Sequence, residues 1–99
     1  MTDLDYDVLY ADASARARDR AGLERFVQRA EEGAERLGHR LYQGIAHRAR
    51  GVLLLLDGQP EPARGRFDQA LAVFEPMGTR WQIGLTLAER ARQGLAALG

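Results

Sequence analysis

The sequence contains no cysteine, no lysine and no asparagine, and its 99 residues include a single serine and a single tryptophan. Without cysteine the chain can form neither a disulfide nor a thiolate nucleophile, which fits a reducing compartment. Without lysine it cannot form a P-loop for phosphate binding. No uninterrupted apolar run exceeds five residues, as in Val52–Leu56, whereas a bilayer-spanning helix needs about 20. The N-terminus lacks a signal-peptide pattern, so we expect a cytoplasmic protein without membrane contact.

All fourteen basic side chains are arginine, and they balance fourteen acidic side chains to a formal net charge of zero. The use of arginine without lysine or asparagine indicates a GC-rich coding sequence and hence a bacterial source. Seven arginines between residues 16 and 40 could contact phosphates. Because the chain has no basic excess, and because no aromatic residues alternate with these arginines, we expect no nucleic-acid partner.

The residues that could carry out chemistry are few and poorly spaced. Ser14 has no nearby histidine to activate it. His39 and His47 are eight positions apart, about 12 Å along a helix, which is too far to share a metal ion. Glu31 and Glu35 share a helix face, but the arginines beside them favour a solvated charged surface. We therefore expect no catalytic residues, no metal site, no cofactor and no enzymatic activity.

The chain repeats itself with a period of about forty residues. Leu37–Arg40 returns as Met77–Arg80, and the pairs Gly44/Gly84, Arg50/Arg90 and Leu55/Leu95 keep the same offset. Each copy has the pattern of two amphipathic helices joined by glycine-containing turns, which is typical of a helical solenoid. We predict one all-α domain over residues 1–99, an antiparallel helix-turn-helix solenoid with approximate repeats at 4–38, 39–78 and, in part, 79–99.

Helix start and stop signals predict five helices. Their approximate ranges are 4–18, 22–37, 40–56, 60–75 and 80–97. Pro76 is expected to end or kink the fourth helix at Glu75. The third helix is expected to be central, because its second half, Val52–Leu56, has no polar face. Apolar residues spaced for one helix face are Leu23, Phe26, Val27, Ala30, Ala34 and Leu37 in the second helix, Ala63, Phe67, Ala70, Leu71 and Phe74 in the fourth, and Trp81, Gly84, Leu85, Ala88, Ala91, Leu95 and Leu98 in the fifth.

The small and large residues of the central region resemble those of tetratricopeptide repeats (TPRs), in the longer forty-residue variety. The residues with this spacing are Gly51, Leu54, Gly58, Ala63, Phe67 and Ala70. The stretch 74–99 is similar to the closing repeats of sensor arms in bacterial LuxR-type regulators that carry a large ATPase module. The resemblance implies a non-catalytic arm that binds effectors or partner proteins. Because lysine and asparagine are absent, the carboxylate clamp that some repeats of this family use for acidic peptide tails cannot form.

The repeat register predicts a ligand site on the concave surface, where the first helix of each pair presents its side chains. The expected groove residues are Asp5, Asp12, Arg16, Ile45, Arg48, Val52, Leu85, Ala88 and Arg92. Their mixture of charge and apolar surface suits a peptide or an amphipathic helix from a protein partner. The alternative at this surface is that Arg48 and Arg92 only pair with acidic side chains across the groove.

The last helix has no repeat partner after it, so we also expect a homodimer that covers its apolar stripe. The residues expected to make this contact are Trp81, Leu85, Leu95 and Leu98. Two alternatives to a peptide-binding module in regulation or assembly stay open. One is a structural repeat unit whose only partner is itself, and the other is an effector-sensing fragment of a larger transcription regulator.

Overall fold

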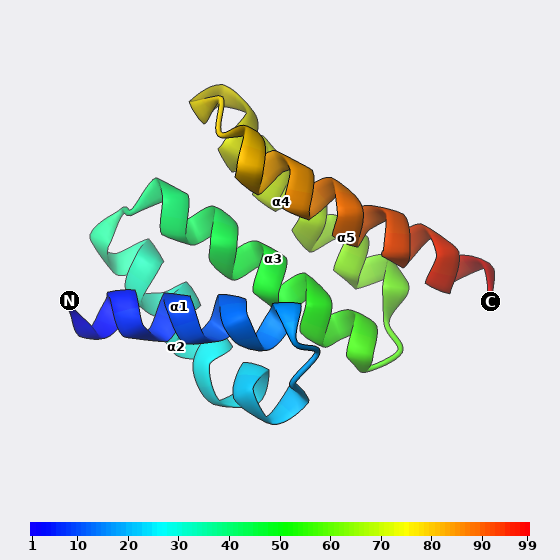
Figure 1. Cartoon of the computed structure of the whole chain (residues 1–99), viewed down its shortest axis with the longest axis horizontal. Helices are drawn as coiled ribbons and strands as arrows, with labels where there is room; N and C mark the ends of the chain where they lie inside the picture. Colours follow the sequence, from blue (N-terminus) through cyan, green and yellow to red (C-terminus); the bar gives the residue numbers. More distant parts are fainter.

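The computed structural model describes all 99 residues, which form five α-helices and no β-strand (Figure 1). The helices are α1 (Asp3–Arg16), α2 (Arg20–Leu37), α3 (Arg40–Leu56), α4 (Pro60–Met77) and α5 (Arg80–Leu98). The predicted all-α class and the number of helices are confirmed. No helix combines the length and the apolar character that crossing a bilayer requires.

The four turns between the helices share one geometry. Each contains one residue with positive φ, and these residues, Arg18, Gly38, Gly58 and Gly78, are twenty positions apart. Each predicted repeat of forty residues therefore holds two helix-turn units of equal length. Arg18 adopts a conformation that costs a non-glycine residue about 1–2 kcal/mol. Its guanidinium donates a hydrogen bond to the backbone oxygen of Ala15 at 2.9 Å, which helps to hold the turn.

Two local expectations were wrong. Pro76 neither ends α4 nor places its boundary at Glu75, since the helix continues to Met77 before Gly78 closes it in the left-handed conformation. A proline in the last turn removes only one helical hydrogen bond, so the cost is small there. Leu37 does not join the buried face of α2, because it lies in the last turn of that helix and is 65% exposed.

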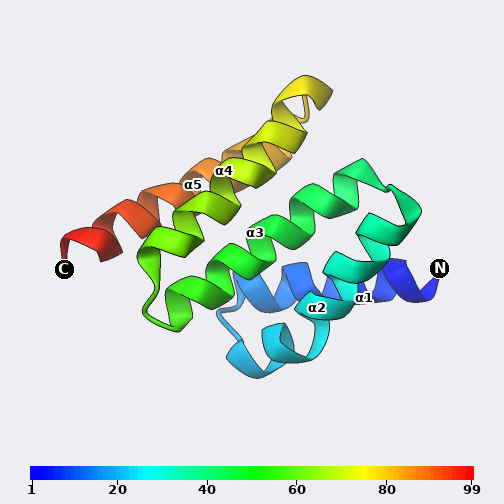
Figure 2. The same cartoon turned by 180° about the vertical axis from the view of Figure 1, so that it is seen from behind.

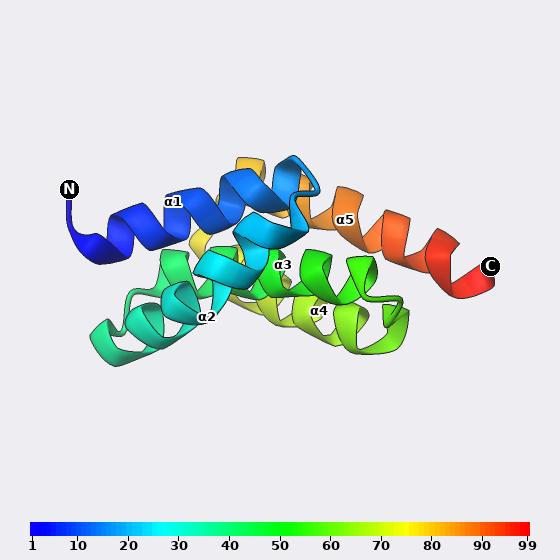
Figure 3. The same ribbon diagram turned by 90° about the horizontal axis from the view of Figure 1, so that it is seen from below.

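Helix α3 is the centre of the fold, as predicted, and it contacts all four other helices. Seen edge-on, α1 and α5 lie along one side of the molecule with α2, α3 and α4 beneath them (Figure 3). The molecule is flat, with principal extents of 40 × 31 × 19 Å. A contiguous core of 18 buried apolar residues joins α1, α2, α3 and α4, whereas α5 contributes no fully buried residue to it.

Two glycines let α3 and α4 approach closely. The ring of Phe74 lies against Gly44 and the ring of Phe67 lies against Gly51, so that a Cβ at either glycine would be 2.4 Å from a ring carbon. Both phenylalanines are completely buried. The apolar face predicted for α4 is buried in full, which confirms that prediction. The contact follows the principle that a large side chain fills the space left by a small one on the facing helix.

Candidate protein-interaction surface

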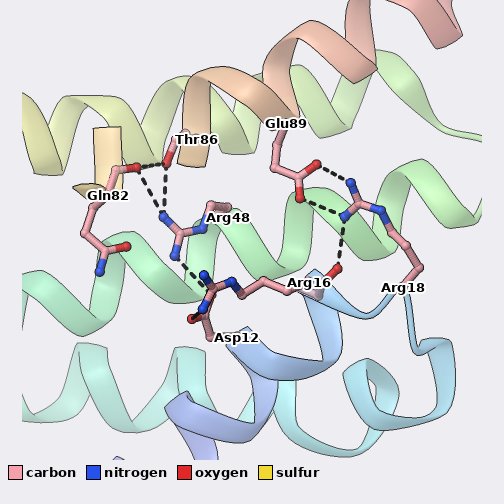
Figure 4. Close-up of polar contacts among 8 residues, drawn as sticks. Asp12, Arg16, Arg18, Arg48, Gln82, Thr86 and Glu89 are labelled. Atoms are coloured by element: carbon pink, nitrogen blue, oxygen red, sulfur yellow. Dashed lines mark hydrogen bonds and ion pairs between the residues drawn. The ribbon is translucent and has the colours of Figure 1, made fainter. Parts of the chain in front are cut away.

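A buried arginine lies where the predicted groove was expected. Arg48 projects from α3 between α1 and α5, and only 2% of it is exposed (Figure 4). Its guanidinium donates to a carboxylate oxygen of Asp12 on α1 at 3.0 Å. On the other side it donates to the backbone oxygen of Gln82 at 3.2 Å and to the hydroxyl of Thr86 at 3.3 Å, both on α5. Arg48 therefore ties the first and last helices together across α3.

A second pair of side chains connects the same two parts of the chain. The guanidinium of Arg18, in the turn after α1, makes two hydrogen bonds to the carboxylate of Glu89 on α5, at 2.5 and 2.7 Å (Figure 4). This contact raises the pKa of Arg18, because the carboxylate stabilises its charged form. Sequence reasoning missed both residues. No periodic signal links them, since they lie 71 positions apart and belong to different repeats.

The residues predicted to line the groove divide into two sets. Ile45, Arg48 and Val52 are buried, with 7%, 2% and 1% of their surface exposed. The expectation that these three side chains face an open groove was therefore wrong. They fill the space between helices instead, because α1 and α5 both pack over this side of α3.

The other predicted groove residues lie at the margins of this contact. Arg16, Ala88 and Arg92 are exposed, and Asp5, Asp12 and Leu85 are half-buried. The guanidinium of Arg92 lies 3.9 Å from Glu89 on its own helix, so it does not reach across the groove. Arg48 does pair with an acid on another helix, as the alternative interpretation of this surface held.

Asp5 connects the start of α1 to α3. Its carboxylate accepts hydrogen bonds from the backbone of Thr2 at 2.8 Å and from the hydroxyl of Tyr42 at 2.5 Å. These bonds lower the pKa of Asp5 to about 2, and the backbone hydrogen bond from Thr2 contributes most. Asp5 therefore fixes a helix end and has its acceptor atoms already engaged.

Helix α5 packs onto the fold through a polar face. Its buried residues are Thr86, Glu89 and Gln93, and the amide of Gln93 donates to the backbone oxygen of Pro60 at 2.9 Å. Its only large apolar contribution to the core is the partly buried Ile83. A helix in a folded domain normally buries its apolar face and exposes its polar face. In α5 this relation is reversed.

Most of the apolar face of α5 points away from the other helices; only at Trp81 does another helix approach, where the guanidinium of Arg16 on α1 lies 5.7 Å from the ring centroid. Trp81, Leu95 and Leu98 are 64%, 72% and 86% exposed. Gly84, Ala88 and Ala91 lie between them and are also exposed, while Leu85 is half-buried. Of the predicted self-association residues, three are thus open to contact. In Figures 1 and 2, α5 runs along one edge of the molecule beside α4, with its far side uncovered.

The exposed face of α5 repeats the face of α3 that receives α4. Forty positions after Gly44 and Gly51 stand Gly84 and Ala91. Whereas a Cβ at Gly44 would meet Phe74, a Cβ at Gly84 would have no atom within 4 Å. Small residues thus recur at the positions where α3 accommodates phenylalanine rings. On α5 the matching surface has no helix upon it.

A separate pocket of about 600 Å³ opens between α2 and α3, with Arg66 of α4 at its edge. It is lined by Glu31, Glu32, Glu35, Arg36, Gln43, Ala46, His47 and Arg66. Glu31 accepts hydrogen bonds from Arg50 at 2.7 and 3.1 Å and from Arg66 at 2.5 Å. Burial alone would raise the pKa of Glu31, but these two arginines outweigh it and lower the pKa. The carboxylate of Glu31 and the guanidinium of Arg66 are therefore already paired. Nowhere do three or more metal-ligating side chains converge to hold an ion.

The imidazole of His47 in this pocket is expected to make the stability of the fold sensitive to mild acid. Burial lowers its pKa, and the nearby charge of Arg66 lowers it further, while Glu31 and Glu35 offset part of the shift. As the pH falls, His47 of the unfolded chain binds a proton near its ordinary pKa, about 6.5. His47 of the folded chain binds its proton only at a lower pH, so acid favours the unfolded chain between the two values. We therefore expect the free energy of unfolding to fall as the pH drops from 7.5 towards the lower, folded-state pKa.

Urea unfolding of the wild type and of the His47→Gln variant across this range measures the effect. The two chains share His39, so the difference between their pH profiles isolates His47. We expect a flatter profile for the variant. Parallel profiles would contradict the assignment to His47.

Comparisons with models of known protein families, with curated proteins and with solved structures find no match to this chain.

Proposed function

We propose that this chain is a non-catalytic protein-interaction module of the tetratricopeptide type, acting in bacterial regulation or assembly, which binds an amphipathic helix on the exposed apolar face of α5. The observation that carries the proposal is the reversed orientation of α5. Its polar residues Thr86, Glu89 and Gln93 are buried, while Trp81 and Leu95 face solvent. A contiguous exposed apolar patch is typical of an interaction site.

The geometry favours this face over the groove between α1 and α5. The floor of that groove is filled by Arg48, whose donors are engaged by Asp12, Gln82 and Thr86. A peptide bound there would have to displace buried hydrogen bonds, which is unfavourable. A helix on the outer face of α5 displaces only water from apolar surface, which is favourable.

The contact between α3 and α4 indicates what an incoming helix needs. Phe67 and Phe74 are seven positions apart on α4 and lie against Gly51 and Gly44. A helix with two large apolar side chains at the same spacing would place them over Ala91 and Gly84 of α5. The partner of this module is therefore a helix with apolar anchors seven residues apart.

A synthetic peptide of residues 59–78, which carries both phenylalanines, is a direct probe of this function. Trp81 is the only tryptophan of the chain and the peptide has none, so emission reports on the protein alone. We expect a saturable shift of Trp81 emission to shorter wavelength as the peptide covers the exposed indole. A peptide with both phenylalanines replaced by alanine is the matched control and should leave the emission unchanged.

The Gly84→Leu variant identifies the binding face. Its side chain has open space around it in the free protein, so the fold should be retained while the position for the phenylalanine is occupied. We expect peptide binding to be lost in this variant. Equal binding by the wild type and by Gly84→Leu would place the interaction elsewhere and would overturn the proposed function.

A further inference from the structure

We infer that the helix that occupies the exposed face of α5 is α5 of a second copy of this chain, packed antiparallel across a two-fold axis. The inference rests on the proposed function, because it takes this face as the docking surface. It adds the identity of the partner and the register of the contact. Three features of α5 support it: the spacing of its exposed apolar residues, the order of their sizes and the placement of charge.

The exposed residues of α5 follow the spacing of a coiled-coil seam. Trp81, Gly84, Ala88, Ala91, Leu95 and Leu98 are separated alternately by three and four positions. This is the a/d pattern of a heptad repeat, in which a narrow stripe faces a single neighbouring helix. The buried residues Thr86, Glu89 and Gln93 lie on the opposite side of the same helix. The stripe is therefore free except at Trp81, where the guanidinium of Arg16 on α1 lies over the ring, 5.7 Å from its centroid.

The order of sizes along the stripe is self-complementary when one copy is reversed. Large residues stand at both ends and small residues in the middle. In the antiparallel register that aligns the two ends, Trp81 lies opposite Leu98 of the second copy and Gly84 opposite Leu95. The centre is then formed by Ala88 opposite Ala91. Each leucine meets a glycine or the indole, and the small central pair allows the two axes to approach closely. A parallel pairing would instead place Trp81 on Trp81 and Gly84 on Gly84, which leaves voids and clashes.

Charge does not oppose this register. The only charged residues of α5 near the seam are Arg80 and Arg92, and they are far apart along the helix. In an antiparallel pair the residues beside the seam meet those on the same flank of the partner helix, so Arg92 lies near Leu85 of the second copy. Its aliphatic stem can cover apolar surface there while the guanidinium reaches water. Glu89 is already held by Arg18 and faces inward. No like charges meet across the axis.

A head-to-tail stack is the competing arrangement. It would place α5 on the exposed side of α1, where Tyr6, Leu9 and Tyr10 are about half exposed. The two tyrosine rings already contact one another at 4.4 Å, and Tyr10 contacts Phe26 at 5.2 Å between centroids. Part of the apolar surface of these two tyrosines is thus already covered within the chain. A head-to-tail contact would also leave an open face on each new copy, so it gives an open-ended series of oligomers where a two-fold contact stops at the dimer.

Sedimentation of the intact chain between about 1 μM and about 1 mM tests the inference. A single five-turn helix per chain makes a small interface, so we expect a monomer–dimer equilibrium with a Kd of about micromolar order. Trp81 emission should move to shorter wavelength over the same concentrations. Gly84→Gln should weaken dimerisation by more than about tenfold, since it fills the position of Leu95 of the second copy. Gly65→Gln is the matched control, because Gly65 also has open space and lies on α4 away from the seam. It should dimerise as the wild type does.

Cysteine pairing tests the register, and the background is nil because the chain has no cysteine. A mixture of Ala88→Cys and Ala91→Cys chains should form the mixed disulfide faster than either chain forms its own. Faster pairing of each variant with itself would indicate a parallel seam and would overturn the inference.

Three further results would overturn it: a monomer at every concentration, an open-ended series of oligomers, or a dimer unaffected by Gly84→Gln. If the monomeric protein still binds the peptide of residues 59–78 through α5, the proposed function stands and the partner is a different helix. If that binding also fails, the proposed function fails with it.

Discussion

Replacing Gly51 with leucine is expected to lower the free energy of unfolding by about 1–3 kcal/mol, and by more if the helices cannot separate. A Cβ at this position would lie 2.4 Å from the ring of Phe67. That ring is completely buried and cannot swing into solvent. The added side chain must therefore push α4 away from α3, at the centre of the core. For a domain of this size the melting temperature should fall by about 4–8 °C per kcal/mol.

The matched control is the same substitution at Gly65. This glycine lies inside α4, is exposed and has no atom within 4 Å of a Cβ. Because leucine is a better helix former than glycine, Gly65→Leu should be neutral or stabilise the chain by about 0.5–1 kcal/mol. An unchanged melting temperature for Gly51→Leu would show that the glycine does not lie at a close helix contact.

The sequence predicted the fold well because its signals are local and repeated. Gly38, Gly58 and Gly78 mark three of the four turns, and all have positive φ in the structure. The remaining turn uses Arg18, whose residue type gives no such signal. Its hydrogen bonds to Ala15 and Glu89 compensate for an unfavourable backbone conformation. A turn held by contacts with a distant helix cannot be recognised from the residues beside it.

The sequence could not predict whether the groove is open or filled, because that depends on how closely helices distant in the sequence pack. The repeat register places Ile45, Arg48 and Val52 on the correct face of α3, towards α1 and α5. It does not reveal that these two helices come close enough to bury them. The spacing of Arg48 from Asp12 and Thr86 is 36 and 38 positions, and no short motif connects them.

The sequence pattern also could not predict which face of α5 packs against the rest of the fold. The spacing of its apolar residues predicts the stripe. The pattern did not identify the buried residues Thr86, Glu89 and Gln93. Polar side chains can pack inside when each finds a partner. Glu89 accepts from Arg18, Thr86 accepts from Arg48, and the amide nitrogen of Gln93 donates to the backbone oxygen of Pro60, while the Oε1 atom of Gln93 has no partner.

Removing the carboxylate of Asp12 should be the most costly change at the contact between α1 and α5. Asp12→Ala would leave the guanidinium of Arg48 without a counter-ion while its side chain is only 3% exposed. The remaining partners, Gln82 and Thr86, are neutral acceptors at 3.2 and 3.3 Å. Deleting one member of a buried ion pair costs about 3–5 kcal/mol. Since Asp12 itself is 19% exposed, we expect a value near the lower end.

A second variant separates the cost of losing the Asp12 carboxylate from the cost of leaving the Arg48 guanidinium buried without a counter-ion. The double variant Asp12→Ala, Arg48→Met replaces the ion pair with apolar groups, and methionine can lie over the ring of Phe74 where the guanidinium now lies, 5.6 Å from its centroid. Because an apolar replacement of a buried ion pair is often close to neutral, the double variant should be more stable than Asp12→Ala alone by more than about 1 kcal/mol. Urea unfolding of the wild type, both single variants and the double variant gives the coupling energy directly. If the costs of the two single substitutions simply add, Arg48 and Asp12 do not act as a pair, and the first and last helices are linked instead by Arg18 with Glu89 and by Arg16 over the ring of Trp81.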